Sequence, residues 1–143
     1  MPKCYQSKVI EAPIEKVWET IKCFHNLNWA PNVVTSVKKV GTLKGNEIGA
    51  KRVLNEAFHE TLLDVCDVGH TFSYSIDEGV SPVSSQEVSN YVGVVKLHPI
   101  TLTNETLIEW KSSWEANTKE AEAFCHMLYV AMMNDLNKSL KEA

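Results

Sequence analysis

The segment 117-NTKEAEAFCHMLYVAMMNDLNKSLK-141 decides the fold, because its pattern predicts one long amphipathic helix. Asn117 can cap the first turn, and Glu120, three residues later, completes a start that resembles a capping box. A helix from there to residue 141 is about 36 Å long, enough to cross a small domain. Apolar residues recur along it every four positions: Phe124, Leu128, Met132 and Leu136. We expect this stripe to face the core.

The residues before this helix predict a sheet. Residues 3–11 alternate loosely between two faces and predict a first strand. Pro13 then suits the first turn of a short helix. That helix carries one apolar stripe, formed by Ile14, Val17, Trp18 and Ile21. Residues 25–31 predict a loop or a second short helical turn. Six strand-like runs follow, separated by short turns, at 34–40, 50–56, 58–66, 70–77, 87–98 and 105–115.

This order of elements predicts an α+β fold. Consecutive strands with short connections form an antiparallel meander, so together with the first strand the sheet is predicted to have seven strands. The sheet can bury the terminal helix only by curling around it, and the gap between a curved sheet and a helix can hold a ligand cavity. No linker, low-complexity tract or repeat interrupts the sequence, so residues 1–143 are predicted to form a single domain.

Composition limits the classes of partner. The chain has 44% hydrophobic residues and a net charge of -4 with 14 Lys and Arg, so nucleic acid is not an expected partner. The first residues lack the apolar stretch of a secretory signal, and nowhere do about 18 apolar residues run together. We therefore expect no membrane insertion and a cytoplasmic location.

The sequence shows no motif for a metal, a nucleotide or a hydrolytic nucleophile. Its 4 cysteines and 5 histidines are scattered, without a C-x-x-C pair or another ligand spacing, so neither a metal site nor a disulfide framework is predicted. A Walker motif, a dinucleotide-binding glycine fingerprint and a G-x-S-x-G elbow are all absent from the sequence. We therefore predict no cofactor.

Five short motifs follow one another in the sequence: Ala12-Pro13-x-x-x-Val17-Trp18, Gly49-Ala50-Lys51-Arg52, His59-Glu60-Thr61-Leu62-Leu63-Asp64, Tyr74-Ser75-Ile76 and Ser89-Asn90-Tyr91. In this order they resemble the START-like (SRPBCC) superfamily, which includes polyketide cyclase/dehydrase and lipid-transport proteins, abscisic acid receptors and birch-allergen-like proteins. The resemblance covers nearly the whole chain and implies a helix-grip fold, a curved sheet wrapped around a long C-terminal helix. The Gly-Leu-Pro-Ala gate and His-Arg-Leu latch of the receptors are absent, so hormone-receptor signalling is not expected.

The resemblance also implies a ligand pocket between the sheet and the helix. By similarity, the inward-facing residues are Glu60, Leu62, Tyr74, Ile76, Tyr91, Gly93, Phe124, Leu128 and Met132. The predicted ligand-binding set is completed by Trp29, Leu54, Phe72, Val83 and Trp110. On the last strand the receptor analogy places Glu109 inward, whereas the apolar alternation favours Ile108, Trp110 and Trp114, and we expect the apolar pattern to hold.

Glu60 is the candidate catalytic residue. If its carboxyl group projects into an apolar cavity, its pKa rises, and it can transfer a proton or anchor a ligand hydroxyl. The other interpretation is a carboxylate at the rim in solvent, paired with Arg52 or Lys51 across the neighbouring strand. Both interpretations stay open at this point.

Three functions are compatible with the sequence. The first is binding or carriage of a small hydrophobic ligand, such as a lipid, polyketide or aromatic compound, without catalysis. The alternative is an enzyme of the cyclase/dehydrase kind, in which Glu60 with Tyr74 or Tyr91 performs acid/base steps. The third is a protein-interaction module with a filled cavity. A homodimer is compatible with each.

Overall fold

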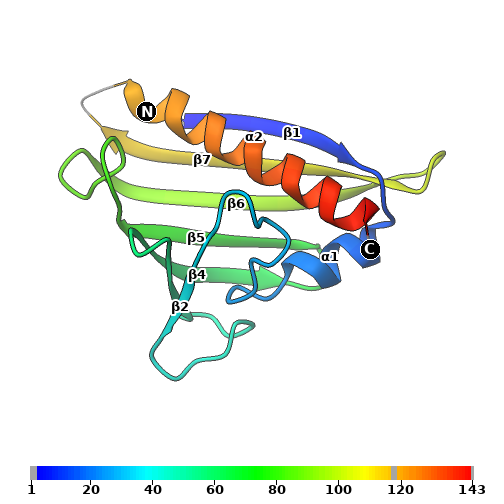
Figure 1. Cartoon of the computed structure of the whole chain (residues 1–143), viewed down its shortest axis with the longest axis horizontal. Helices are drawn as coiled ribbons and strands as arrows, with labels where there is room; N and C mark the ends of the chain where they lie inside the picture. The colour runs from blue at the N-terminus through cyan, green and yellow to red at the C-terminus, as the bar shows by residue number, and fades with distance from the viewer. Residues whose placement is uncertain (1–2, 117–118, 143) are drawn as a thin grey trace.

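The computed structural model describes residues 3–116 and 119–142. Its elements are β1 (Lys3–Ile10), α1 (Ile14–Ile21), β2 (Val37–Val40), β3 (Lys51–Leu54), β4 (Phe58–Cys66), β5 (Thr71–Glu78), β6 (Val88–Ile100), β7 (Glu105–Ala116) and α2 (Glu120–Lys141). The strands form one seven-stranded antiparallel sheet in the order β1-β7-β6-β5-β4-β3-β2 (Figure 1). The predicted helix-grip architecture of the α+β class is confirmed.

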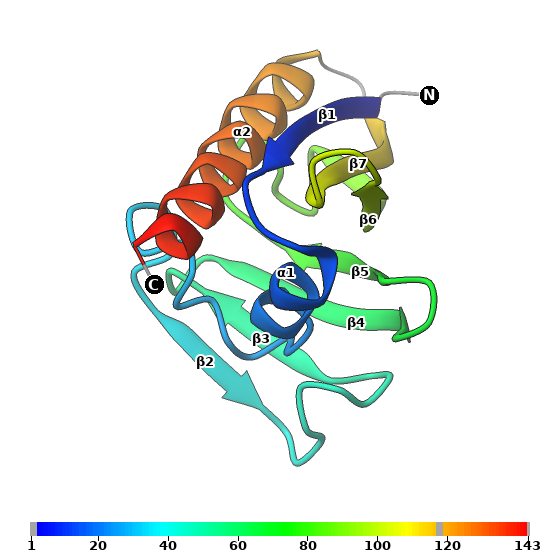
Figure 2. The same cartoon turned by 90° about the vertical axis from the view of Figure 1, so that its right-hand side faces the viewer.

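The sheet curves around α2. Figure 1 shows α2 crossing the strands obliquely, and Figure 2 shows both helices on the same side of the curved sheet. Side chains alternate across the strands, so Ile108, Trp110 and Trp114 of β7 are buried on the inner face. Glu109 points outward and accepts a hydrogen bond from Tyr5 on the outer face. The apolar pattern therefore predicted the facing of β7 correctly, and the receptor analogy for Glu109 is wrong.

The connection between α1 and β2 is a loop over residues 25–31, the first of the two predicted alternatives. It contains hydrogen-bonded turns, such as Ala30 N–H to Leu27 C=O at 3.0 Å. The predicted strand 34–40 is shorter and begins at Val37, because Asn55 Oδ1 accepts hydrogen bonds from the backbone of Thr35 and Ser36 and holds them outside the sheet.

The predicted apolar stripe of α2 is wrong in its first half. The helix begins at Glu120, and the expected cap Asn117 lies outside the described residues. Its buried face consists of Ala121, Cys125, Tyr129, Met132, Met133, Asp135, Leu136 and Leu140. Phe124 and Leu128 are only half-buried. The buried residues Cys125 and Tyr129 each follow a predicted residue by one position, so the buried face of this half is turned by about 100° from the predicted stripe.

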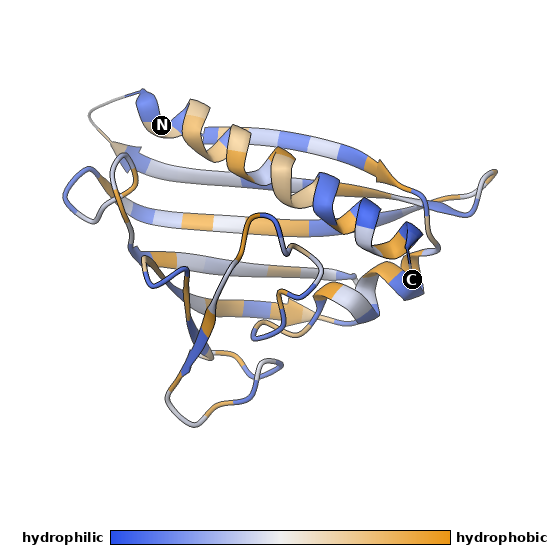
Figure 3. Ribbon diagram, viewed as in Figure 1, coloured by the Kyte–Doolittle hydropathy of each residue, from blue (hydrophilic) through white to orange (hydrophobic). Residues whose placement is uncertain are grey.

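The second half of α2 holds the α1–β2 connection against the core. Figure 3 shows that the more hydrophilic residues of α2 gather in this half. One of them, Asp135, is nevertheless buried, and it accepts hydrogen bonds from the Asn32 backbone N–H and side-chain amide at 2.8 Å each. Each oxygen of this buried carboxyl group accepts a hydrogen bond, so Asp135 anchors the loop to α2.

Gly93 of β6 makes room for an aromatic side chain on the neighbouring strand. A Cβ atom at this position would lie 2.5 Å from Cζ and 2.7 Å from the hydroxyl oxygen of Tyr74. Real Cβ atoms do not approach other atoms so closely, so any larger residue here must displace the Tyr74 ring from the core.

We expect Gly93→Ala to lower the free energy of unfolding by about 1–3 kcal/mol, because the added methyl group overpacks the core. Chemical denaturation monitored by circular dichroism measures this change. Gly69→Ala is the matched control, since its Cβ would meet only side-chain atoms, the nearest being Cys66 Sγ at 3.3 Å and Thr71 Cγ2 at 3.6 Å. An equal effect of the two substitutions would contradict the close approach at Gly93.

Candidate functional site

A small cavity lies between the inner face of the sheet and the middle of α2. Its volume is about 30 Å³. Its wall is formed by Val33, Val34, Arg52, Leu54, Asn55, Phe58, Glu60, Tyr74, Ile76, Trp110, Leu128, Tyr129 and Met132. These residues come from the α1–β2 connection, the four strands β3, β4, β5 and β7, the β3–β4 turn and α2, so the cavity is the place where the curved sheet, the loop and the helix meet.

The cavity is far smaller than an ordinary ligand pocket. Its volume of about 30 Å³ suits one water molecule, whereas ligand sites usually enclose about 300–1,000 Å³. A larger hollow of about 610 Å³ lies along residues 25–37, but it is a surface depression with no buried charged group. The small interior cavity is lined by buried charged side chains and is therefore the candidate functional site.

An ion pair is buried at the wall of this cavity. Arg52 of β3 and Glu60 of β4 are directly opposite in the strand register and both point inward. Arg52 Nε and Nη2 lie 2.8 and 2.6 Å from Glu60 Oε1. Arg52 Nη1 donates to the Phe24 carbonyl at 2.8 Å, and the guanidinium stacks on the Phe24 ring at 3.7 Å. Arg52 is thus held by the Glu60 carboxylate, the Phe24 carbonyl and the Phe24 ring, and these contacts fix the ion pair at the cavity wall.

Burial and the ion pair act in opposite directions on Glu60. Desolvation raises the pKa of its carboxyl group above the ordinary value, and the adjacent Arg52 guanidinium lowers the pKa but does not cancel that effect. The structure thus combines both interpretations of this residue, because Glu60 points into the interior and also pairs with Arg52. It does not lie in solvent at the rim.

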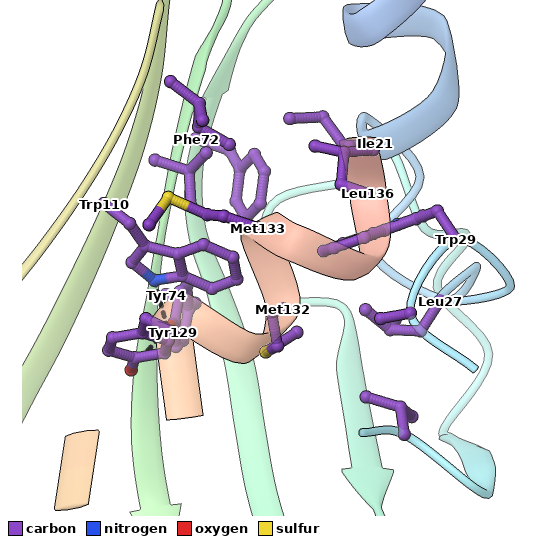
Figure 4. Packing of buried hydrophobic residues seen from close by; sticks show 14 of the residues in the cluster. Ile21, Leu27, Trp29, Phe72, Tyr74, Trp110, Tyr129, Met132, Met133 and Leu136 are labelled. Atoms are coloured by element: carbon purple, nitrogen blue, oxygen red, sulfur yellow. Dashed lines mark hydrogen bonds between the residues drawn. The ribbon is translucent and has the colours of Figure 1, made fainter. Parts of the chain in front are cut away.

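A chain of hydroxyl groups crosses the interior beside the ion pair. Trp110 Nε1 donates to the Tyr74 hydroxyl at 3.0 Å, and Tyr74 donates to the Tyr129 hydroxyl at 2.7 Å. Tyr129 and Tyr91 also hydrogen-bond to each other, and Tyr91 donates to Cys125 Sγ at 3.4 Å. Figure 4 shows Trp110, Tyr74 and Tyr129 grouped at one side of α2. The chain links β5, β6 and β7 to the helix.

The three tyrosines stay protonated in this environment. Burial is the main cause that raises the pKa of each phenol, and neighbouring acidic groups raise it further. Tyr74 lines the cavity together with Glu60, whereas Tyr91 lies outside the cavity wall. Of the two acid/base pairs considered for catalysis, only Glu60 with Tyr74 shares one cavity.

Seven predicted ligand-binding residues meet at the cavity: Leu54, Glu60, Tyr74, Ile76, Trp110, Leu128 and Met132. Seven others lie elsewhere: Trp29, Leu62, Phe72, Val83, Tyr91, Gly93 and Phe124. Phe124 packs on Phe58 at 6.4 Å between ring centroids, and Phe72 packs toward Trp18 of α1. Trp29 is buried in the core, where it packs against Trp110.

The structure adds residues that the predicted set lacked. Arg52 had been considered only as a surface partner of Glu60, and Tyr129 follows the predicted Leu128 by one position on α2. Tyr129 could have been found from its spacing, because it continues a stripe of Ala121 and Cys125 at intervals of four. Val33, Val34 and Asn55 come from loops, in which no periodic pattern indicates facing.

Two general properties bear on the class of protein. In the part of the chain that the structure describes, neither helix has the length and apolar character needed to cross a membrane. Within residues 3–116 and 119–142, no three side chains of the metal-binding types come together.

Known proteins share this fold over nearly their full length. A family model described as polyketide cyclase / dehydrase and lipid transport matches residues 1–141. A protein from Nitrosospira multiformis has a TM-score of 0.94 at 43% identity, covering 96% of this chain and 94% of that one. XoxI from Bacillus cereus has a TM-score of 0.79 at 23% identity, with 97% and 95% covered. Major latex-like protein 151 from Panax ginseng has a TM-score of 0.76 at 13% identity, with 96% and 95% covered.

The two more distant structures show the fold alone, and none of the curated proteins compared matches this chain. The fold and the interior site define a helix-grip protein with a buried ion pair beside a small cavity. The match of the family model over residues 1–141 identifies the family, so the chain belongs to the polyketide cyclase/dehydrase and lipid transport family.

Glu60 and Glu78 are predicted to titrate on opposite sides of the ordinary carboxyl value of 4.5. Hydrogen bonds from Ser85 and Gly79 lower the pKa of Glu78 to about 2. Because folded Glu60 holds its proton more tightly than unfolded Glu60, its contribution makes the unfolding free energy fall as pH rises above that value. Carboxyl ¹³C NMR titration measures both groups. A Glu60 midpoint at or below 4.5 would contradict the burial of its charge.

Tyr129→Phe should lower the free energy of unfolding by about 1–3 kcal/mol, because it leaves the buried hydroxyls of Tyr74 and Tyr91 without their shared partner. Thermal and urea denaturation measure the loss. Tyr5→Phe removes one hydroxyl from a half-exposed ring on the outer face and should change stability by less than about 0.5 kcal/mol. Equal losses would show that the interior hydroxyl chain has no special role.

Proposed function

We propose that the protein binds a small apolar molecule in the space between the sheet and α2. One observation carries this proposal: the wall of the interior cavity includes Phe58, Ile76 and Leu128, three half-buried apolar side chains from β4, β5 and α2. In this proposal these three side chains form the entrance of the cavity. Apolar burial, at about 25 cal/mol per Å², would supply most of the binding free energy.

Binding requires the cavity to widen. A ligand of ordinary size needs roughly ten times the present volume of about 30 Å³. The residues at the entrance are suited to this change, because Leu128 and Phe58 are not fully enclosed and Met132 has a flexible, unbranched side chain. Arg52 and Glu60, which are held by several contacts, would keep their positions while the entrance moves.

A second candidate function is a cyclase/dehydrase. The observation that favours it is the pairing of Glu60, with its raised pKa, and the Tyr74 hydroxyl in one cavity. A third is a protein-interaction module, which the small cavity volume favours. We rank binding first because Arg52 holds Glu60 at Oε1 and the proton of Tyr74 is already donated to Tyr129.

Location and assembly follow as further parts of the proposal. The cysteines Cys4, Cys23, Cys66 and Cys125 are free thiols, as is usual in a reducing compartment, which supports the cytoplasm as the site of action. A homodimer stays a prediction, and light scattering during size-exclusion chromatography measures it.

Native mass spectrometry of gently purified protein, followed by organic extraction, tests the proposal. We expect an apolar adduct near one per chain, or uptake of the neutral fluorophore Nile red by the empty protein. Leu128→Asp should weaken Nile red binding at least about tenfold, because a carboxylate would enter the apolar wall. Met127→Asp is the matched control on the exposed side of α2 and should leave binding unchanged.

A clean protein that takes up no Nile red would contradict the binding proposal and favour the interaction module. Turnover of a polyketide-like substrate that Glu60→Gln abolishes, with substrate binding retained, would instead favour the enzyme.

A further inference from the structure

The polar groups of the cavity wall differ in how far their hydrogen bonds are already used. Six polar side chains line the cavity: Arg52, Asn55, Glu60, Tyr74, Trp110 and Tyr129. A ligand can pair only with donors or acceptors that remain free, and a buried polar group left unpaired costs binding free energy. The free groups therefore indicate which chemical class of ligand the cavity accepts.

Asn55 is engaged in the architecture of the loops. Its Oδ1 atom accepts hydrogen bonds from Thr35 N at 2.7 Å and from Ser36 N at 3.3 Å, and its Nδ2 donates to the Val33 carbonyl at 2.9 Å. The backbone at Asn55 is left-handed, with φ of 55°, and this amide fixes the neighbouring segment in place. Asn55 therefore has a structural role and is not available to orient a ligand.

The aromatic donors are also engaged. The indole N–H of Trp110 is donated to Tyr74, and the O–H of Tyr74 is donated to Tyr129. Tyr129 in turn shares its hydroxyl with Tyr91, whose own O–H reaches Cys125. Every proton of this chain has an acceptor inside the protein. A ligand that needs a donor from these aromatic residues would have to break the chain.

The ion pair of Arg52 and Glu60 still has hydrogen-bonding groups that are free. Glu60 receives both contacts from Arg52 at the same oxygen, Oε1, and Oε2 accepts no hydrogen bond from the residues that the structure describes. Arg52 has five N–H groups: Nε donates to Glu60 and Nη1 donates to the Phe24 carbonyl, while Nη2 lies 2.6 Å from Glu60 Oε1, so N–H groups remain free. The site thus offers one free carboxylate oxygen next to spare guanidinium N–H groups.

We infer that the ligand of the proposed pocket carries a hydroxyl group, as a phenol or an alcohol does, and that this hydroxyl donates to Glu60 Oε2. A hydroxyl can donate to the carboxylate and also accept from a free guanidinium N–H, so it satisfies both members of the ion pair. The inference rests on the binding proposal above and adds the chemical class of the ligand.

Other head groups fit this site less well. A ketone or an ether only accepts hydrogen bonds and leaves Oε2 unpaired. A carboxylate places a second negative charge beside Glu60, and an ammonium places a second positive charge beside Arg52. Since Arg52 and Glu60 already neutralise each other, a neutral group that both donates and accepts is the best match.

Matched naphthalene probes test the inference on the wild-type protein. 2-Naphthol carries the hydroxyl, 2-methylnaphthalene replaces it by a methyl group of similar size, and 2-naphthoate replaces it by an anion. We expect 2-naphthol to bind about tenfold or more tightly than either of the others, as measured by Nile red displacement, because a hydrogen bond to a charged group is worth about a factor of ten or more in affinity.

A variant pair locates the effect. The double variant Arg52→Gln, Glu60→Gln keeps two hydrogen-bonding side chains of similar shape but removes both charges, so the preference for 2-naphthol should fall below about threefold. Glu15→Gln, on the exposed face of α1, is the control and should retain the full preference. If the double variant fails to fold, the relative affinities of the three probes for the wild-type protein still test the ligand class.

The outcomes separate the two proposals. Equal binding of 2-naphthol and 2-methylnaphthalene, or tighter binding of 2-naphthoate, overturns the ligand class but leaves the pocket. An undiminished preference in a folded double variant also overturns it. Binding of none of the three probes overturns the pocket itself, and the hydroxyl inference falls with it.

Discussion

Three tyrosine hydroxyls and one indole N–H hold α2 against the sheet, and the arrangement of the interior depends on them. Each group is buried, so each must find a partner inside the protein. Tyr129 meets this requirement only when the helix is rotated so that its ring stacks on Trp110, at 4.5 Å between centroids, and its hydroxyl reaches Tyr74 and Tyr91. That rotation leaves Phe124 and Leu128 half-buried at the margin of the core.

The same constraint explains why the sheet was easier to predict than the helix. Strand facing follows from a simple alternation, and Phe72, Tyr74, Ile108 and Trp110 lie where alternation placed them. On α2, apolar character alone favoured Phe124 and Leu128 over Cys125 and Tyr129. The buried face is decided by polar partners on β5 and β6, about 30 to 55 residues away in the sequence, and these partners are visible only in the fold.

Glu60 shows the same limit for the candidate site. From the sequence, Glu60 could be placed on a strand and Arg52 named as a possible neighbour. An inward carboxylate and a paired carboxylate were alternatives at that point. In the structure the pairing accompanies burial, because an inward charge is tolerated in an apolar interior only with its partner. Half of the expected pocket residues packed elsewhere because large aromatic side chains fill most of the space inside the curved sheet.

The pairing of β1 with β7 has a consequence for how the protein folds. Lys3 is opposite Ser113 and Ile10 is opposite Thr106, so these neighbouring strands come from distant parts of the chain. Contacts of such long sequence separation slow folding, because the entropy of closing a large loop is lost before the contacts form. During synthesis, β1 must wait for β7 to emerge, and its unpaired edge is exposed until then. The rate of folding, more than final stability, is the property most sensitive to changes in this pairing.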